Sequence, residues 1–232
     1  TVKQPPTALT LNPEAKTINV GDTFTPGLTY TPVNTSEDMK GVTWNSNDTS
    51  VATVASNGLV TGVGPGTAVI TATSTADTSV TSSACTVTVE QLPTALTIPS
   101  AQTINTGASF TPTVTYTPAN TSADKKGVTW SSDTPAIAKV DAATGLVTGV
   151  APGTAHITAI SSVDTSIVSN ICTVTVERMP TSISLDPTAK TINVGDTFTP
   201  TVSYSPADTS TTKKGVTWTS GTASVATVDA AT

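Results

Sequence analysis

Val42–Ser74 reads VTWNSNDTSVATVASNGLVTGVGPGTAVITATS, and this stretch decides the fold class. Apolar and polar residues alternate within it, so that Val42 and Trp44 share one face of a run and Thr43 takes the other. This period of two is typical of strands that pack one face on a core and leave the other in water. Turn residues such as Ser56-Asn57-Gly58 separate the runs. The stretch therefore predicts antiparallel β-structure.

The alternation continues on both sides of this stretch. Phe24–Tyr30 is predicted as one strand whose even-numbered residues share a face, and Cys85–Glu90 as a closing strand whose odd-numbered residues point inward. No segment shows a convincing period of 3.6 residues, so the fold class expected is all-β. The runs between turns indicate about seven or eight strands in a two-sheet sandwich.

The chain repeats itself. Pro6, Pro93 and Pro180 each begin a similar motif and lie 87 residues apart, and KGVTW occurs at Lys40–Trp44, Lys126–Trp130 and Lys214–Trp218. KTINVGDTFTP is identical at 16–26 and 190–200. This period is too long for a solenoid unit, which runs to roughly 50 residues, and is close to the ~100 residues of an immunoglobulin-like sandwich.

Composition narrows the possible functions. The 232 residues are 36% hydrophobic and 11% charged, with a net charge of −6. The acidic balance argues against nucleic-acid binding, which needs clustered Lys and Arg to displace counterions. No apolar run approaches the roughly 18 residues that span a bilayer, so no direct membrane insertion is expected. No targeting signal is visible at Thr1.

The spaced motifs closely resemble the bacterial immunoglobulin-like group 2 (Big2) family. They appear at Val42–Ser74 and again as VTWSSDTPAIAKVDAATGLVTGVAPGTAHITAISS at Val128–Ser162. The resemblance extends over essentially the whole chain. It implies an Ig-like sandwich that serves as a building block in bacterial surface adhesins and phage virion proteins, and it implies no shared active site and no single ligand.

The repeat predicts tandem Ig-like β-sandwich domains, two complete and a third truncated. VDAAT continues into GLVTGV at Val140–Thr144 but ends the sequence at Val228–Thr232, so we expect the last strands of the third domain to be missing. An alternative is donor-strand exchange, in which a neighbour supplies those strands. The expected boundaries are residues 1–5 for the tail of a preceding domain or linker, 6–92 for the first domain, 93–179 for the second and 180–232 for the third.

The aromatic residues occupy equivalent positions in each repeat, which indicates a structural core, with Trp as the residue expected on the C strand. A stacking platform for sugars is the alternative, but the core accounts for all nine rings. Cys85 and Cys172 are also equivalent, face inward and have no partner within their own domain, so buried free thiols are predicted. The predicted structural core comprises Phe24, Tyr30, Trp44, Cys85, Phe110, Tyr116, Trp130, Cys172, Phe198, Tyr204 and Trp218.

No residue pattern predicts catalysis or a cofactor. His156, the only histidine, is expected to face solvent, and its counterpart in the first repeat is Val69. A zinc site needs three or four converging ligands, and a Ser-His-Asp triad is not expected in only one copy of a repeat. The carboxylates are scattered, with one glutamate, Glu90 or Glu177, near each linker. Calcium prefers several closely spaced oxygen ligands, so no metal is predicted, although a weak cation site remains an alternative.

The lysine pairs before each tryptophan strand, Lys125-Lys126 and Lys213-Lys214, are interpreted as a solvated turn that also discourages strand pairing. Binding to an anionic surface is the alternative. The glycine-rich Gly62–Gly66 lacks the Lys-Ser/Thr of a phosphate-binding loop. The linkers VEQLPTALT and VERMPTSIS are short and contain proline, so they are expected to be semi-rigid.

These features predict a non-catalytic array of Ig-like modules that acts as a semi-rigid spacer or decoration segment of a phage virion protein. The stalk of a bacterial cell-surface adhesin and accessory modules of an extracellular glycan-active enzyme are the alternatives. Unpaired thiols favour the virion, because exported proteins tend to avoid them. The expected partners are neighbouring domains of a longer chain, virion or cell-surface components, and host surface glycans or proteins. The expected location is the virion or the bacterial cell surface.

Overall fold

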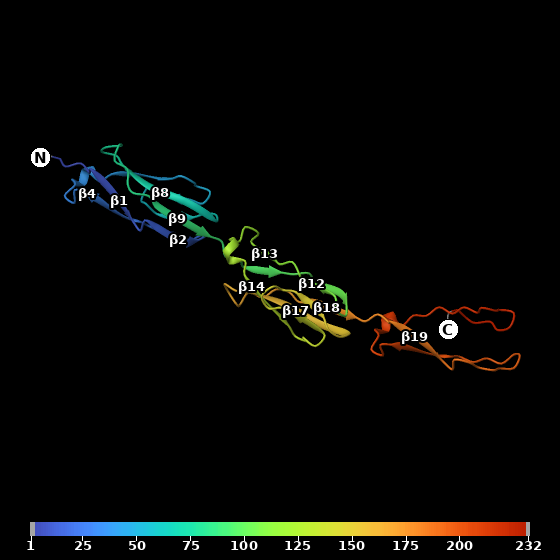
Figure 1. Ribbon diagram of the computed structural model, residues 1–232. Helices are drawn as coiled ribbons and strands as arrows, with labels where there is room; N and C mark the ends of the chain where they lie inside the picture. The colour runs from blue at the N-terminus through green and yellow to red at the C-terminus, as the bar shows by residue number, and fades with distance from the viewer. Residues whose placement is uncertain (1–2, 231–232) are drawn as a thin grey trace. The chain divides into compact units, whose positions relative to one another are not determined.

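The computed structural model describes residues 3–230. These residues form strands and three short 3-10 turns and contain no α-helix, so the prediction of an all-β chain is confirmed (Figure 1). No helix in the described part is long and apolar enough to span a membrane. Residues 1–2 and 231–232 lie outside the described range, which leaves out part of the expected leading segment 1–5 and of Val228–Thr232. The 3-10 turns are η1 (Glu37–Met39), η2 (Ala123–Lys125) and η3 (Thr211–Lys213).

The chain divides into two compact units, each containing parts of the repeats. The first unit consists of residues 1–97, 115–128 and 160–168. The second unit consists of residues 98–114, 129–159 and 169–232.

The first repeat has nine strands in three hydrogen-bonded sheets. Its four-stranded sheet has the order β2-β9-β8-β5, its three-stranded sheet the order β3-β7-β6, and β1 pairs with β4. The expected number of seven or eight strands is therefore corrected to nine. The strands are β1 (Ala8–Asn12), β2 (Ala15–Asn19), β3 (Thr23–Phe24), β4 (Gly27–Thr31), β5 (Val42–Ser46), β6 (Ala52–Val54), β7 (Val60–Gly62), β8 (Gly66–Ser74) and β9 (Cys85–Glu90).

Proline accounts for the additional strands. Phe24–Tyr30, predicted as one strand, is divided at Pro26 into β3 and β4, which belong to different sheets. Pro13 separates β1 from β2 in the same way. Proline has no N–H with which to continue a ladder, so a strand commonly ends or changes sheet there.

The first and last parts of the repeat meet in a parallel pair. β2 runs parallel to β9, with Ile18 opposite Val89 and Asn19 opposite Glu90, while β8 runs antiparallel to β9, with Ile70 opposite Cys85. β9 therefore lies between β8 and β2 and joins the beginning of the repeat to its end. A parallel pair of this kind needs a long connection, which here is most of the repeat.

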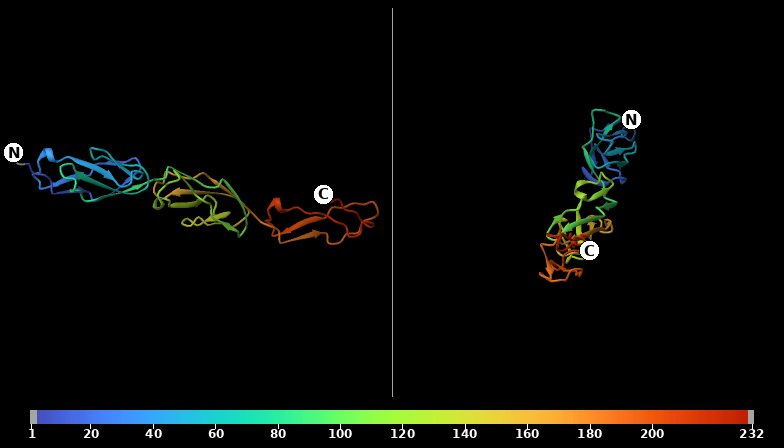
Figure 2. Two further views of the ribbon diagram at one scale, coloured as in Figure 1. Left: turned by 90° about the horizontal axis from the view of Figure 1, so that it is seen from above. Right: turned by 90° about the vertical axis from the view of Figure 1, so that its right-hand side faces the viewer.

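The second repeat reproduces this arrangement strand by strand. Its sheets have the orders β11-β18-β17-β14 and β12-β16-β15, and β10 pairs with β13. In both of these repeats the strands face one another across a narrow interior (Figure 2). The strands are β10 (Ala95–Thr97), β11 (Ala101–Asn105), β12 (Ser109–Phe110), β13 (Thr115–Thr117), β14 (Val128–Ser132), β15 (Ala138–Val140), β16 (Val147–Gly149), β17 (Gly153–Ser161) and β18 (Cys172–Glu177).

The core of the first repeat consists mostly of small and β-branched residues. Ile70 on β8 and Val87 on β9 have no exposed surface, and Phe24, Leu28 and Trp44 pack against this cluster while remaining half-buried. β8 has the burial expected of alternation, its inward residues buried and its threonines partly exposed. Burying each such side chain contributes about 1.5–3 kcal/mol, so the inward face supplies most of the driving force.

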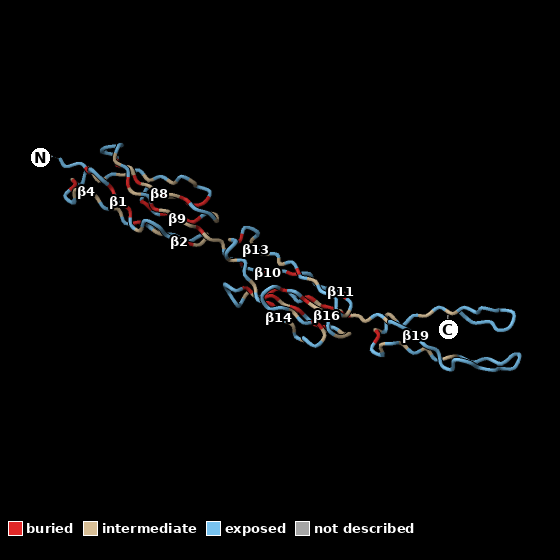
Figure 3. Tube along the Cα trace, viewed as in Figure 1, coloured by how far each residue is buried: buried red, intermediate tan, exposed pale blue. Residues whose placement is uncertain are grey.

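The third repeat contains only β19 (Ser182–Asp186), β20 (Thr201–Ser205) and η3 within residues 180–230. Leu185 is 42% exposed, whereas its equivalent in the first repeat, Leu11, is 1% exposed. The difference is visible as the change from buried to exposed colouring along the chain (Figure 3). Among residues 180–230 no strand equivalent to β8 or β9 covers this face.

One segment shows directly that strands here depend on their partners. KTINVGDTFTP forms most of β2 and all of β3 at residues 16–26, but the same eleven letters at 190–200 form no strand. The two differ in tertiary partner: β2 pairs with β9 and β3 with β7, and no counterparts of β7 or β9 exist among residues 201–230. Strand propensity is weak compared with such pairing.

Candidate functional site

The tyrosines are half-buried and anchor the turn that precedes each tryptophan strand. Tyr30 Oη donates a hydrogen bond to the Lys40 carbonyl at 2.6 Å, and Lys40 Nζ lies 5.8 Å from the centre of the ring. Burial raises the pKa of Tyr30 and outweighs the opposing effect of Lys40. The same hydroxyl-to-carbonyl bond and lysine contact join Tyr116 to Lys126 and Tyr204 to Lys214. A lysine ammonium thus lies over each ring, which makes these rings structural anchors.

The other predicted core residues differ between repeats. Trp130 is 6% exposed, whereas Trp44 and Trp218 are half-buried. Phe24 and Phe110 are half-buried, but Phe198 is 45% exposed. The prediction that Phe198 lies in a core is not met within the described residues, because its equivalent Phe24 pairs with Val60 of β7 and the third repeat has no such strand among them.

Cys85 and Cys172 are free, fully buried thiols on the inward faces of β9 and β18. Burial raises the pKa of each thiol because the surrounding apolar side chains disfavour a thiolate. Since the thiolate is the reactive form, the two groups are suited to packing and poorly suited to nucleophilic chemistry.

His156 is exposed and has a partner that the alternating pattern did not indicate. Its amide donates to Asp133 Oδ1 at 2.8 Å, and its Nδ1 lies 2.7 Å from Asp133 Oδ2. Hydrogen bonds from the His156 amide and then from its ring lower the pKa of Asp133 to about 2. In the first repeat Asn47 Oδ1 accepts the equivalent bond from the Val69 amide at 2.7 Å. The shared function of this position is therefore to hold a loop against a strand.

Two further aspartates, at equivalent positions of the first two repeats, are hydrogen-bonded within their own turns. Asp77 accepts bonds from the amide and hydroxyl of Ser79, and Asp164 does the same with Ser166, which lowers the pKa of both aspartates. These are self-contained turns of a kind that aspartate commonly makes. Within residues 3–230 no group of three or more His, Cys, Asp or Glu side chains is placed to hold a metal ion.

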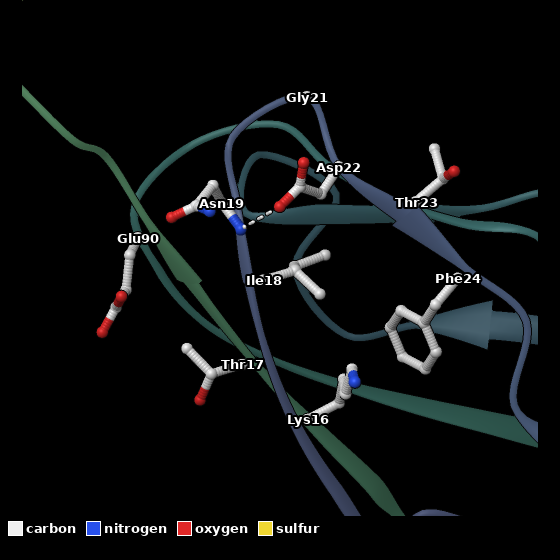
Figure 4. A pocket seen from close by; sticks show the side chains of 9 residues that line it. All are labelled: Lys16, Thr17, Ile18, Asn19, Gly21, Asp22, Thr23, Phe24 and Glu90. Carbon is white, nitrogen blue, oxygen red and sulfur yellow. Dashed lines mark hydrogen bonds between the residues drawn. The ribbon is translucent and has the colours of Figure 1, made fainter. Parts of the chain in front are cut away.

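A groove with a volume of about 760 Å³ lies at one end of the first repeat (Figure 4). Asp22 accepts a hydrogen bond from the Asn19 amide at 2.9 Å across the turn that forms its rim. Its charged groups are Lys16, Asp22 and Glu90, and its lining includes no histidine or cysteine.

At the junction between the first two repeats, the consecutive residues Glu90 and Gln91 are hydrogen-bonded to different repeats. The Glu90 carbonyl, at the end of β9, accepts from the Val20 amide at 2.9 Å. The next residue, Gln91, donates from its amide to Ser122 Oγ and accepts at its carbonyl from the Ser122 amide, both at 2.9 Å. All four residues belong to the same compact unit.

We call this reciprocal pair of hydrogen bonds the junction clamp. It recurs between Arg178 and Ser210, at 2.8 and 3.0 Å, directly after Glu177. It also recurs between Gln4 and Ser36, both bonds at 2.9 Å. In each case the serine immediately precedes a 3-10 turn.

Charged side chains reinforce the clamps. Lys125 Nζ lies 3.0 Å from Glu90 Oε2, and Lys213 Nζ lies 2.8 Å from Glu177 Oε2. The interpretation of these lysines as merely solvated is therefore wrong: Lys125 and Lys213 form ion pairs at the junctions, and the lysine after each contacts a tyrosine ring. The recurrence of one glutamate per linker and one lysine pair per turn was the available sequence signal.

The nine-strand arrangement, repeated with the same order and with a tryptophan facing the core, is that of an Ig-like module. The sequence matches the bacterial Ig-like domain (group 2) family at residues 6–87, 94–169 and 180–232. The chain belongs to this family. The clamps at Gln91 and Arg178 thus lie where one group 2 Ig-like domain passes into the next.

Two curated relatives are similar to this group 2 array. An uncharacterized protein of Clostridium acetobutylicum is 35% identical over 58% of the chain and 14% of its own length. Ice-binding protein 1 of Shewanella frigidimarina is 31% identical over 96% of the chain and 26% of its own length. The array therefore corresponds to about a quarter or less of these relatives.

Among solved structures, domains 1–6 of the surface layer protein SbsC match 80% of the group 2 array and 30% of their own chain. The sequence identity is 20% and the TM-score is 0.35.

Proposed function

We propose that this chain is a non-catalytic spacer, a series of group 2 Ig-like modules that holds other parts of a longer protein at a distance. The observation that carries the proposal is the junction. Glu90 is still bound within the first repeat while Gln91 is already bound to the turn of the second, so no free residue separates the modules. A flexible tether would instead need several unbound residues, commonly Gly and Ser.

The surfaces of the modules fit this role. The tyrosine rings, the thiols and the carboxylates named above are all engaged in holding turns or filling cores. The polar side chains that recur between repeats recur in structural contacts, as Tyr30, Tyr116 and Tyr204 do. Binding and catalytic residues, in contrast, are usually gathered in a pocket with converging polar groups.

We propose an extracellular or cell-surface setting, or a virion. The free buried thiols Cys85 and Cys172 favour a protein that folds in a reducing cytoplasm, as a phage structural protein does. The stalk of a bacterial surface adhesin is the second candidate, supported by membership of the group 2 Ig-like family. Accessory modules on a glycan-active enzyme are the third.

The spacer proposal is tested by deleting Pro93–Met179 from the protein that carries this chain. The deletion joins Gln91-Leu92 to Pro180 and places Glu90 where Glu177 precedes the third repeat, so that Lys213 remains available to it. We expect an attachment or display function that depends on reach to fall, and to recover when an unrelated Ig-like sandwich replaces the deleted residues. Recovery only with the original residues would refute the spacer role.

Ice affinity supplies a second test, because one relative is named for ice binding. The relative is matched over 26% of its length, so the spacer proposal assigns ice recognition to the remainder of that protein. We expect the present 232-residue chain to show no thermal hysteresis and no partition into growing ice. Adsorption to ice by this chain would identify ligand recognition as its function.

A further inference from the structure

The three junction clamps share their backbone hydrogen bonds but not their charges. The residue before the clamp is Lys3, Glu90 or Glu177. Lys3 forms an ion pair with Asp38 of its turn, whereas Glu90 and Glu177 pair with lysines. The residue after Asp38 is Met39, where the other two turns have Lys125 and Lys213. The charge of the residue at the strand end and the charge of the residues in the turn therefore change together, so that opposite charges still meet.

A second pair of positions changes in the same concerted way. The clamp residue is Gln4, Gln91 or Arg178, and four residues after each tyrosine stands Asn34, Asn120 or Asp208. Arg178 Nη1 lies 3.2 Å from Asp208 Oδ2. A cation thus occupies the first position only in the repeat that has an anion at the second. Positions that change together are commonly in contact, as Arg178 and Asp208 are.

We propose that each junction carries a charge code, a matched pair of signs by which the 3-10 turn of one repeat accepts the strand end of the repeat before it. The partner of this surface is the preceding copy of the same module, and the code makes the copies non-interchangeable. The inference rests on the spacer proposal for its biological use, and its test below measures the clamp itself.

The position and partial burial of the Glu90–Lys125 ion pair explain why the charges at a junction should matter. Glu90 belongs to the first repeat, since it pairs with Asn19 in the sheet, while Lys125 belongs to the turn of the second. Their side chains are only 22% and 23% exposed, so water screens the pair less than at an open surface. Lys125 also lies 2.9 Å from Asp124, which aligns it toward the junction. A lysine placed at Glu90 would therefore meet Lys125 as a like charge.

The residues of the first clamp show which second substitution should compensate for a charge reversal at Glu90. Glu90→Lys combined with Lys125→Met reproduces the residues of the first clamp, because Asp124 already stands at the position of Asp38. The readout is amide hydrogen exchange of Gln91 and Ser122 in the full chain, since those two amides form the clamp and exchange only when it opens.

We expect Glu90→Lys to lower the protection of both amides by about two- to five-fold, the range expected for losing an exposed or partly exposed ion pair. Adding Lys125→Met should restore most of it, while Lys125→Met alone should lower it because Glu90 then faces Asp124. Lys139→Met, on the exposed face of β15, serves as the control and should change nothing. The Val174 amide of β18 reports whether the second repeat itself has been destabilised.

Two outcomes would overturn the charge code. One is unchanged protection in Glu90→Lys, and the other is a loss that Lys125→Met does not repair. The other junction provides an independent repeat of the test, in which Arg178→Gln and Asp208→Asn each loosen the Arg178 and Ser210 amides and the double variant restores them. The deletion of Pro93–Met179 tests the spacer proposal, and amide exchange tests the charge code. A chain can fail the first test and pass the second, so failure of one proposal is distinguishable from failure of the other.

Discussion

Gly145 lies against the indole ring of Trp130, so closely that a Cβ at Gly145 would stand 2.5 Å from Trp130 Nε1. Gly145 also has a φ of +74°, in the left-handed region that favours glycine. Gly107 in the same repeat has a φ of +83°, but a Cβ added there would meet no neighbouring atom within 4 Å. The two glycines therefore separate backbone strain from steric contact.

We expect Gly107→Ala to destabilise the second repeat by about 1–2 kcal/mol, the cost of a left-handed conformation for an L-residue. Gly145→Ala should cost a further 1–3 kcal/mol or so, since the ring must move within a packed interior. Urea unfolding followed by tryptophan fluorescence measures both. Equal losses for the two variants would show that the ring can move freely.

Cys85 and Cys172 should be unreactive in the native protein. Both are fully buried, and burial raises their pKa, so the thiolate that a thiol reagent requires is scarce. We expect no labelling before denaturation and labelling of both cysteines after it, and mass spectrometry of the unreduced protein should show no disulfide. A bridged cysteine would remove the argument for assembly in a reducing compartment.

Asp133 should contribute acid-sensitive stability. Its folded-state pKa of about 2 lies below the ordinary value near 3.9, so its contribution is complete above about pH 4 and is lost as the pH falls towards 2. Asp133→Asn should keep the bond to the His156 amide, as Asn47 does for Val69, and should remove this part of the acid dependence. Asp133→Ala should lose the bond and lower the melting temperature at neutral pH. Melting curves of the three proteins between about pH 2 and pH 7 test the ordering.

The 87-residue repeat should be the folding unit. We expect Pro93–Met179 to unfold cooperatively by itself, because it contains β10 through β18 and its own buried core. Pro180–Thr232 should not fold alone, because it has two described strands and an exposed face that includes Leu185 and Phe198. A dispersed NMR spectrum from monomeric Pro180–Thr232 would contradict the proposed boundaries.

Alternation and repetition were enough to predict the all-β class and the inward phase of the closing strands. Cys85, Val87 and Val89 are all buried, as their spacing indicates. The division at Pro26 was not predicted, because the side chains on both sides of it keep the same phase and only the missing N–H reveals the change of sheet. The exposure of Phe198 was not predicted either, since its position within the repeat is that of Phe24.

Polar contacts between distant segments were hardest to predict. The Glu90 and Lys125 side chains are 35 positions apart, and neither alternation nor turn propensity relates a strand end to the turn of the following repeat. The relation appears only when the repeats are placed one above another and the signs at the two positions are compared. Asp133 and His156 had no such signal, because the first repeat has Asn47 and Val69 in their places.

The identical segments at 16–26 and 190–200 bear on how such a chain can change length over generations. A crossover between the matching stretches would excise or duplicate 174 residues, which is two whole periods, and would leave the register of every strand intact. Length would then vary by whole modules, here two at a time, and not by fractions, since a partial module leaves strands without partners. The charges at the junctions would limit which modules can follow one another in a recombinant chain. The order of the modules would then be inherited along with their number.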